Sequence, residues 1–367
     1  MTATTIKTGI LKCDKLPFAA LSDNNSVQLD GTVGEGGGQI LRTSLLLSTI
    51  TGRPFRLQKI RLKRPVPGLR PQHIAAISAF SKATGAYVEG ASIGSTSIYF
   101  RPDLKVKENV KIDVGTAGSI TLILGSIIPA LALRGKEVKV TVVGGTDTKW
   151  SPTYDYFSNV VKNMYDRIGI KFRCELIRRG YYPAGGGLVE TNIYPSKLSS
   201  LNVAERINGQ VMIKSVCSNL PGHVARRQAD SCVKYLEDRN IEVGGIDISM
   251  ENALSPGSSL LAFIPSSDYF IGSDMVGERG LRAEEIGMRV AESLAHLYSS
   301  KASLDSHAAD MAIPLLGLAG GKSSFTTPQL TEHMQSNIYV LKQFIDCSIN
   351  ISRQTSYVRV DIDSTGI

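Results

Sequence analysis

The sequence predicts a mixed α/β (α+β) fold, built from three repeated βαβαββ-type units with a smaller α/β domain inserted in the third unit. Three observations lead to this prediction. A helix–strand–helix–strand–strand order recurs three times in the 367 residues, and the second helix of each unit ends near residues 84, 168 and 346. The intervals between these ends are 84 and 178 residues, so the third unit holds 94 extra residues, about one small domain. The net charge also changes sign across that extra segment.

The first unit has two helices with clear ends. Apolar residues at helical spacing predict a helix at 39–51, which Gly52 ends. Pro71 at the start and Gly85 after the end predict a second helix at 71–84. Strands are predicted at 55–61, 86–89 and 97–100.

The same order returns twice. The second unit is predicted to have helices at 119–133 and 153–168 and strands at 137–143, 171–178 and 188–194. The third is predicted to have helices at 304–317 and 330–346 and strands at 323–326, 347–353 and 357–361.

The extra segment has its own alternation of strands and helices. Strands are predicted at 210–216, 243–250, 259–265 and 269–272, and helices at 224–239 and 282–299. We therefore expect a loose N-terminal arm at 1–27, a large three-repeat catalytic domain at 28–203 with 301–367, and a small inserted domain at 204–300.

The basic residues gather in the first part of the chain. The formal net charge is +8, but residues 1–203 hold 27 basic and 14 acidic residues, net +13, while residues 204–300 carry −4 and residues 301–367 carry −1. Seven cations lie between Arg53 and Arg70 with no acid among them, and they repel one another unless an anion is near. The pattern favours a polyanionic partner such as nucleic acid, bound away from the insert, and a merely basic surface is the alternative.

The composition excludes several classes of protein. Hydrophobic residues make up 42% and mean hydropathy is about zero, which predicts a globular core rather than disorder. No apolar run reaches the roughly 18 residues that span a bilayer, so no membrane is expected. The five cysteines are scattered and never form CxxC, which favours a reducing compartment, the cytoplasm or the nucleoplasm of a nucleated cell.

A glycine-rich string, DGTVGEGGGQ, precedes the first helix at residues 30–39. Glycines let a backbone approach a phosphate, and free N–H groups at a helix start attract anions. The string is neither a P-loop nor a dinucleotide fingerprint, and a tight turn without a ligand explains it equally well. Glu35 beside Arg42 would suit a divalent metal near a nucleotide, or would simply favour the helix dipole.

His333 follows Thr331, a predicted N-cap, and so lies in the first turn of a helix. A helix N-terminus disfavours imidazolium and so favours the neutral, nucleophilic ring. Because His333 is off the apolar stripe of this helix, it is available to attack phosphorus. A surface histidine on a capped helix is the alternative.

Six strings together resemble the RNA 3′-terminal phosphate cyclase family. They are DGTVGEGGGQILR (30–42), GLRPQH (68–73), TAGS (116–119), GGTD (144–147), RGYYPAGGG (179–187) and LTEHMQSNIYVLKQF (330–344). The resemblance runs from about residue 28 to the C-terminus, in family order, and the family fold of three repeats with an insert agrees with the spacing.

The resemblance implies an ATP-dependent reaction that needs Mg²⁺ or Mn²⁺. A histidine is adenylylated, AMP passes to an RNA 3′-phosphate, and the adjacent 2′-OH closes a 2′,3′-cyclic phosphate. By motif position His333 is implied as the catalytic nucleophile and Glu35 as the metal ligand. The residues implied for ATP and phosphate binding are Arg42, Arg64, Gln72, His73, Pro152, His307 and Asp310, with Pro152 near the adenine and Asp310 near the sugar or base.

Two alternatives to a cyclase remain. The family contains a ribosome-assembly branch without activity, whose members lack the histidine, so the intact LTEH string favours the active branch. Another transferase on a repeat scaffold, such as an enolpyruvyl transferase, also fits the repeats but not the His333 string. The chain departs from the family where it has Gly125 in place of a glutamine and His307 in place of an aromatic residue, although a histidine can still stack on a base.

Overall fold

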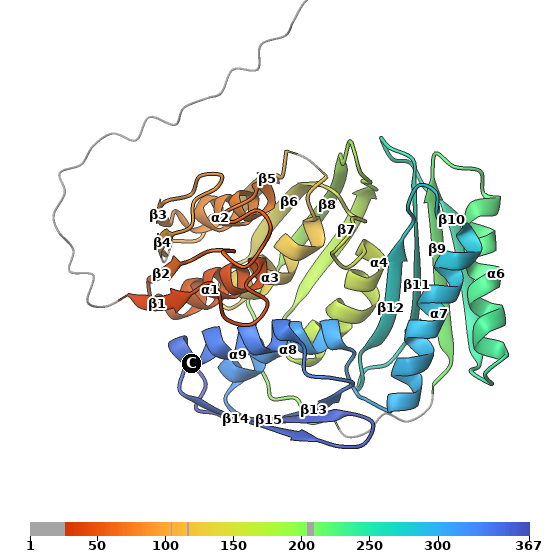
Figure 1. The fold of residues 1–367 in the computed structure, drawn as a ribbon. Helices are drawn as coiled ribbons and strands as arrows, with labels where there is room; N and C mark the ends of the chain where they lie inside the picture. The colour runs from red at the N-terminus through yellow and green to blue at the C-terminus, as the bar shows by residue number, and fades with distance from the viewer. Residues whose placement is uncertain (1–25, 104, 116, 204–208) are drawn as a thin grey trace, which may run out of the picture.

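The computed structural model describes residues 26–103, 105–115, 117–203 and 209–367. The expected arm at 1–27 lies outside these residues except for Ser26 and Val27, and Val27 already begins the first strand. Figure 1 shows sheets arranged around a group of helices, with a further sheet and its own helices to one side.

The first unit forms a four-stranded sheet in the order β1-β2-β4-β3, with β1 and β2 parallel and the other pairs antiparallel. Its elements are β1 (Val27–Asp30), α1 (Gly38–Thr51), β2 (Phe55–Gln58), α2 (Pro71–Thr84), β3 (Tyr87–Glu89) and β4 (Ile98–Arg101). Both helices end as predicted, because Gly52 and Gly85 take left-handed φ values of 74° and 73° that stop the helix.

The second unit repeats this topology in the order β5-β6-β8-β7. Its elements are β5 (Asn109–Asp113), α3 (Ile120–Ala132), β6 (Val138–Gly144), α4 (Tyr154–Tyr156), a π-helical turn (Phe157–Val161), α5 (Lys162–Arg167), β7 (Phe172–Arg178) and β8 (Gly187–Ile193).

The third unit has the order β13-β15-β14, and a parallel bridge from Asn202 to Ser324 stands where its first strand would be. Its elements are α8 (Ser306–Ala319), β13 (Gly321–Thr327), α9 (Glu332–Phe344), β14 (Cys347–Arg353) and β15 (Val358–Ser364). The predicted fold class, a mixed α/β repeat structure, is thereby confirmed.

The inserted segment forms a separate sheet in the order β10-β9-β11-β12, covered by two helices. Its elements are β9 (Val211–Ser218), α6 (His223–Glu237), β10 (Val243–Met250), β11 (Gly257–Ile264), β12 (Ile271–Val276) and α7 (Ala283–Ser300). These elements share a hydrophobic core of their own, from Val211 to Ala295. We keep 204–300 as the proposed bounds of the inserted domain.

The helices of the three repeats lie between their sheets, as Figure 1 shows for α1, α3, α8 and α9. Helix α1 packs against α3 and α9, and α8 packs against α9, so the three units share one core. Because α1 and α9 are neighbours, the glycine-rich string and His333 are brought together although they are about 300 residues apart.

Several predicted elements differ from the structure in their bounds, and the strand predicted at 269–272 is observed at Ile271–Val276. Strand β2 stops at Gln58 rather than at residue 61, because Lys59 and Arg61 have φ values of 55° and 57° that no strand accommodates. The helix predicted at 153–168 is interrupted by the π-helical turn at Phe157–Val161.

In the described ranges, no helix has the length and apolarity to cross a membrane. The four cysteines that fall within them are free thiols.

Candidate active site

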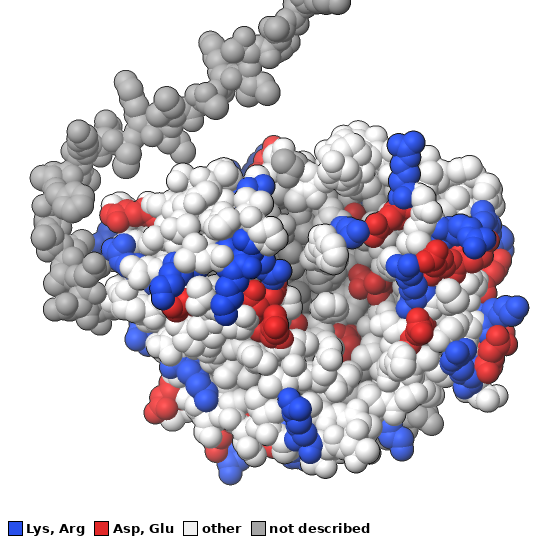
Figure 2. Space-filling view, in the orientation of Figure 1, with Lys and Arg blue, Asp and Glu red and all other residues white. Residues whose placement is uncertain are grey.

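A single pocket of about 900 Å³ brings together every residue for which the sequence suggested a site role. These residues are Glu35, Arg42, Arg64, Gln72, His73, Pro152, His307, Asp310 and His333. Figure 2 shows the hollow on this face, with Lys and Arg on both sides of it and Asp and Glu inside. The placement agrees with a shared site, while the role of each residue stays a prediction.

Several helices begin at this pocket. Gly38 opens α1, Gln72 lies in the first turn of α2, His307 in that of α8 and His333 in that of α9, and all of them line the pocket. The N–H groups of a helix start carry partial positive charge and favour anions, although at α8 the carboxylate of Asp305 already accepts the N–H groups of His307 and Ala308.

The glycine-rich string packs where side chains would not fit. Gly34 and Gly36 have φ values of 61° and 63°, and a Cβ at Gly34 would collide with Ser336 of α9. A Cβ at Gly38 would lie 2.5 Å from Nε2 of His73. The glycines therefore let the start of α1 approach α2 and α9 around the pocket.

His333 lies beside Glu35. Its Nδ1 is 2.6 Å from Oε2 of Glu35, and the other carboxylate oxygen pairs with Arg64. Neither Nδ1 of His333 nor Oε2 of Glu35 has a well-aligned hydrogen bond to a described residue. Burial lowers the pKa of His333 below 6.5; Asp310 opposes this shift, and Arg42 and Arg64 add to it. The ring is therefore neutral at pH 7 and has a lone pair available for attack.

Arg42 and His73 provide donors that face the pocket. Burial lowers the pKa of Arg42 to about 10, which still leaves the guanidinium charged at pH 7, and its NH2 donates to Oε1 of Gln39 at 2.7 Å. Burial, together with Arg42, Arg61 and Arg70, lowers the pKa of His73 to about 3. Nδ1 of His73 accepts the N–H of Arg70 at 2.9 Å, so the ring proton is on Nε2, which faces Gly38.

Asp310 joins α8 to the start of α9. Its carboxylate accepts a hydrogen bond from Oγ1 of Thr331 at 2.5 Å, and its carbonyl accepts one from Nδ2 of Asn337 at 2.6 Å. Thr331 is the N-cap of α9, as predicted, and accepts the N–H of Met334. Burial raises the pKa of Asp310 to about 6, so this carboxyl titrates close to neutral pH.

Pro152 and His307 line another part of the pocket. The carbonyl of Pro152 accepts from Oγ1 of Thr121 at 2.7 Å, at the start of α3. The ring of His307 meets Tyr156 edge to face, with centroids 6.1 Å apart. At the departure from the family pattern, a Cβ on Gly125 would lie only 3.2 Å from Cε of Met311, so Met311 already occupies the space that a side chain here would need.

The inserted domain also lines the pocket, which the sequence reasoning missed. Asp274, Met275, Val276 and Glu278 come from β12 and the loop after it. The expectation that the site lies away from the insert is therefore wrong. No motif marks these residues, and contacts between distant segments, such as the packing of α4 against β11 and β12, bring them to the site.

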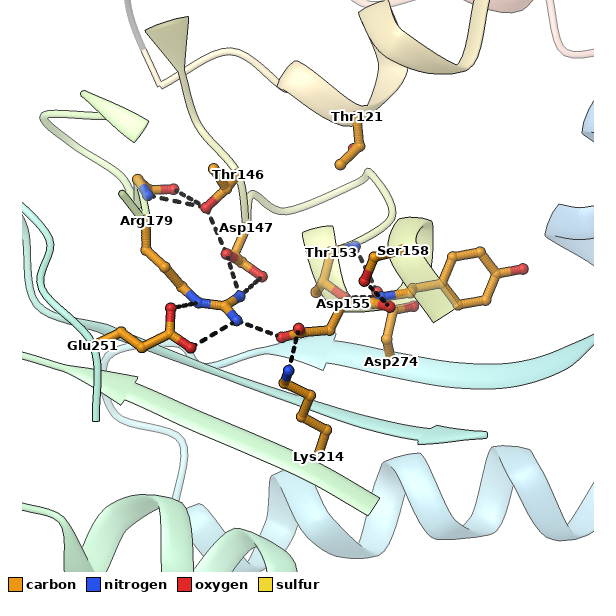
Figure 3. Close-up of polar contacts among 12 residues, drawn as sticks. Thr121, Thr146, Asp147, Thr153, Asp155, Ser158, Arg179, Lys214, Glu251 and Asp274 are labelled. Carbon is orange, nitrogen blue, oxygen red and sulfur yellow. Dashed lines mark hydrogen bonds and ion pairs between the residues drawn. The ribbon is translucent and has the colours of Figure 1, made fainter. Parts of the chain in front are cut away.

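A buried ion cluster joins the second repeat to the insert (Figure 3). Arg179 has a side chain that is 1% exposed, and it pairs with Asp147 at 3.1 Å, Asp155 at 2.8 Å and Glu251 at 2.9 Å. Lys214 of β9 pairs with Asp155 at 3.3 Å. Asp147 and Arg179 lie in the quoted strings GGTD and RGYYPAGGG, but their pairing could not be inferred from them.

No cluster of three or more His, Cys, Asp or Glu side chains suited to a metal occurs in the described part of the chain. Glu35 is the carboxylate of the glycine-rich string that lines the pocket, and one of its oxygens lacks an aligned hydrogen bond.

The chain is similar to proteins of known name over most of its length. A family model described as RNA 3′-terminal phosphate cyclase matches residues 33–351. Two relatives that carry this name are from Archaeoglobus fulgidus and Pyrobaculum aerophilum. The first is 42% identical over 87% of this chain and 95% of that protein. The second is 38% identical over 93% of this chain and 99% of that protein. The relative from Sulfurisphaera tokodaii is 41% identical over 90% and 98%.

Among solved structures, the enolpyruvyl transferase NikO from Streptomyces tendae matches with a TM-score of 0.36 and 11% identity. The match covers 91% of this chain and 48% of that one, and it supports no inference about function.

Proposed function

The chain belongs to the RNA 3′-terminal phosphate cyclase family and is an enzyme of RNA processing, and we propose that it converts an RNA 3′-phosphate to a 2′,3′-cyclic phosphodiester through enzyme–histidyl-AMP and RNA-adenylate intermediates. ATP is the activating substrate. The observation that carries these steps is a neutral histidine at a pocket where cations and helix N-termini converge.

In the first step Nε2 of His333 attacks the α-phosphorus of ATP and pyrophosphate leaves. Glu35, 2.6 Å from Nδ1, favours the tautomer that has its proton on Nδ1, which leaves the Nε2 lone pair free. The guanidinium of Arg42 and the Nε2–H of His73 are placed to stabilise the charge that develops on phosphate oxygens.

In the second step an oxygen of the RNA 3′-phosphate attacks the phosphorus of histidyl-AMP, and His333 is released as the neutral ring. In the third step the 2′-OH attacks the activated 3′-phosphorus, AMP leaves, and the hydroxyl proton passes to solvent. Arg64 and Gln72 line the same pocket and are proposed to hold phosphates of ATP or of the RNA end.

The adenosine of ATP is proposed to lie against Pro152 and His307. Pro152 is buried and held by Thr121, so it offers a fixed apolar surface, and the His307 ring can stack on a base. Asp310, nearby on α8, is proposed to accept a hydrogen bond from the sugar or base.

Glu35 is the residue proposed to hold a divalent metal. Mg²⁺ is commonly bound by one or two carboxylates together with substrate phosphates, which a single Glu at the glycine-rich string can satisfy. When bound, Mg²⁺ or Mn²⁺ would stabilise negative charge on phosphate oxygens. The residues present therefore fit a metal shared with ATP rather than an all-protein metal cage.

The product assay is direct. A 3′-phosphorylated RNA incubated with ATP and Mg²⁺ should become resistant to phosphatase, because the cyclic phosphate has no free monoester. His333→Ala should leave the RNA sensitive to phosphatase, and His296→Ala, an exposed histidine on α7, should retain full conversion. RNA that stays sensitive to phosphatase with the folded, RNA-bound wild-type chain would favour the catalytically silent alternative.

A further inference from the structure

Trp150 is the only tryptophan in the chain, and 88% of its surface is exposed. It lines the pocket, on the loop between β6 and α4. A scattered exposed apolar residue needs no explanation. Trp150, however, has the largest of all side chains, and that side chain is almost fully exposed to water at the rim of the proposed phosphate site.

The backbone at Trp150 is strained. Its φ is 69°, in the left-handed region that bulky residues rarely adopt. Ser151 holds the turn by donating from Oγ to the carbonyl of Thr148 at 2.9 Å. The preceding Lys149 pairs with Glu278 of the inserted domain at 2.8 Å. The conformation of this loop thus keeps the indole of Trp150 exposed at the rim of the pocket.

Both ends of this loop are fixed by the buried ion cluster. Arg179 pairs with Asp147 before Trp150 in the chain and with Asp155 after it, and Figure 3 shows the two carboxylates on the same guanidinium. The N–H of Thr153 donates to Asp274 at 2.7 Å. Trp150 is therefore exposed on a loop that contacts with the second repeat and with the inserted domain hold in place.

A cation accompanies the ring. Nζ of Lys149 lies 5.0 Å from the centroid of Trp150. An aromatic surface beside positive charge is the combination with which proteins bind single-stranded nucleic acid, since a base stacks on the ring and the cation attracts the backbone.

The observations favour a base of RNA over the adenine of ATP. Pro152, two residues further on, is buried, and the proposed adenosine site is there and at His307, whereas Trp150 is at the rim. We propose that Trp150 is a stacking platform for a base at or next to the 3′ end of the RNA, so that it positions the terminal phosphate in the pocket. This inference rests on the proposed function.

The single tryptophan provides a direct test that needs no turnover. RNA with a 3′-phosphate, titrated without ATP, should quench the intrinsic fluorescence of the full chain, because a stacked base alters the excited indole. The same RNA with abasic residues at its last two positions should bind through its phosphates with little quenching. ATP alone should quench much less than the intact RNA.

Variants supply the second readout. Trp150→Ala should weaken binding of labelled 3′-phosphorylated RNA by about 5- to 150-fold, the range of one lost base–aromatic stack. Trp150→Phe, which keeps a ring, should retain most of the affinity. Binding of RNA without any fluorescence change, or equal affinity in Trp150→Ala, would overturn the stacking site.

The two proposals fail separately. If ATP quenches as strongly as RNA, and Trp150→Ala weakens ATP binding but not RNA binding, then the indole of Trp150 stacks on the adenine of ATP and the inference is overturned. If RNA quenches but the product assay yields no cyclic end, the stacking site is supported and the proposed function alone is overturned.

Discussion

The imidazole of His333 is under opposing electrostatic influences. Burial, Arg42 and Arg64 favour its neutral form, and Asp310 favours its protonated form. Its folded-state pKa lies below the usual 6.5, so the neutral ring that the proposed attack needs is present throughout the neutral pH range and is lost as the pH falls below the folded-state pKa.

Asp310→Asn should therefore shift the acid limb of adenylylation to lower pH. Asp310 is ionised above its pKa of about 6, and its negative charge stabilises the imidazolium. With that charge removed, protonation of His333 requires more acid. The measurement is the initial rate of enzyme–AMP formation against pH at saturating ATP, so that weaker nucleotide binding does not enter.

Glu332→Gln is the matched control. Glu332 is exposed and neighbours His333 in sequence, so the same loss of charge there should move the limb less. A limb that moves to higher pH in Asp310→Asn would show that Asp310 does not act on His333 through its charge.

At the residue scale, the sequence predicted the lining of the pocket better than its contacts. His333 and Glu35 were recognised from their strings, and both line the pocket. The partner of Nδ1 could not be foreseen, because it depends on how α1 and α9 pack. The sequence assigns Trp150 no role, since its exposure and its φ exist only in three dimensions.

At the element scale, the ion cluster of Arg179 connects the second repeat to the insert. Burial alone would lower the pKa of Arg179, but Asp147, Asp155 and the hydrogen bond to Glu251 raise it, so the guanidinium stays charged. Two of its partners are 32 and 72 residues away in the chain, so no local pattern predicts their pairing.

Arg179→Met should lower the free energy of unfolding by about 3–5 kcal/mol, because it leaves buried carboxylates without their partner. Urea denaturation followed by circular dichroism measures this change. Arg173→Met, at an exposed position of strand β7, which ends just before Arg179, should change stability by about 0.5 kcal/mol or less. Equal stability of the two variants would contradict a structural role for the cluster.

Element boundaries were predictable where chemistry marks them. Pro71 and Gly85 enclose α2 as expected, and Thr331 caps α9. The strand predicted at 55–61 was too long, since its β-like pattern could not reveal the positive φ values of Lys59 and Arg61. The π-helical turn inside the helix predicted at 153–168 has no sequence signal that we recognise.

At the scale of the whole molecule, the position of the insert follows from the repeat intervals, but its part in the site does not. The charge balance suggested that anions bind away from the insert, whereas Asp274 and Glu278 of the insert line the pocket. The site is assembled from all three repeats and the insert, so its chemistry depends on the complete fold.

The central claim is that His333 is the residue that AMP modifies. The most direct test is to incubate the full chain with α-labelled ATP and Mg²⁺ or Mn²⁺, without RNA, and to map the labelled peptide. The prediction is one acid-labile, alkali-stable AMP adduct on the peptide that contains His333, absent from His333→Ala. A folded, ATP-saturated chain without label, or label on His73 of the same pocket, would contradict the claim.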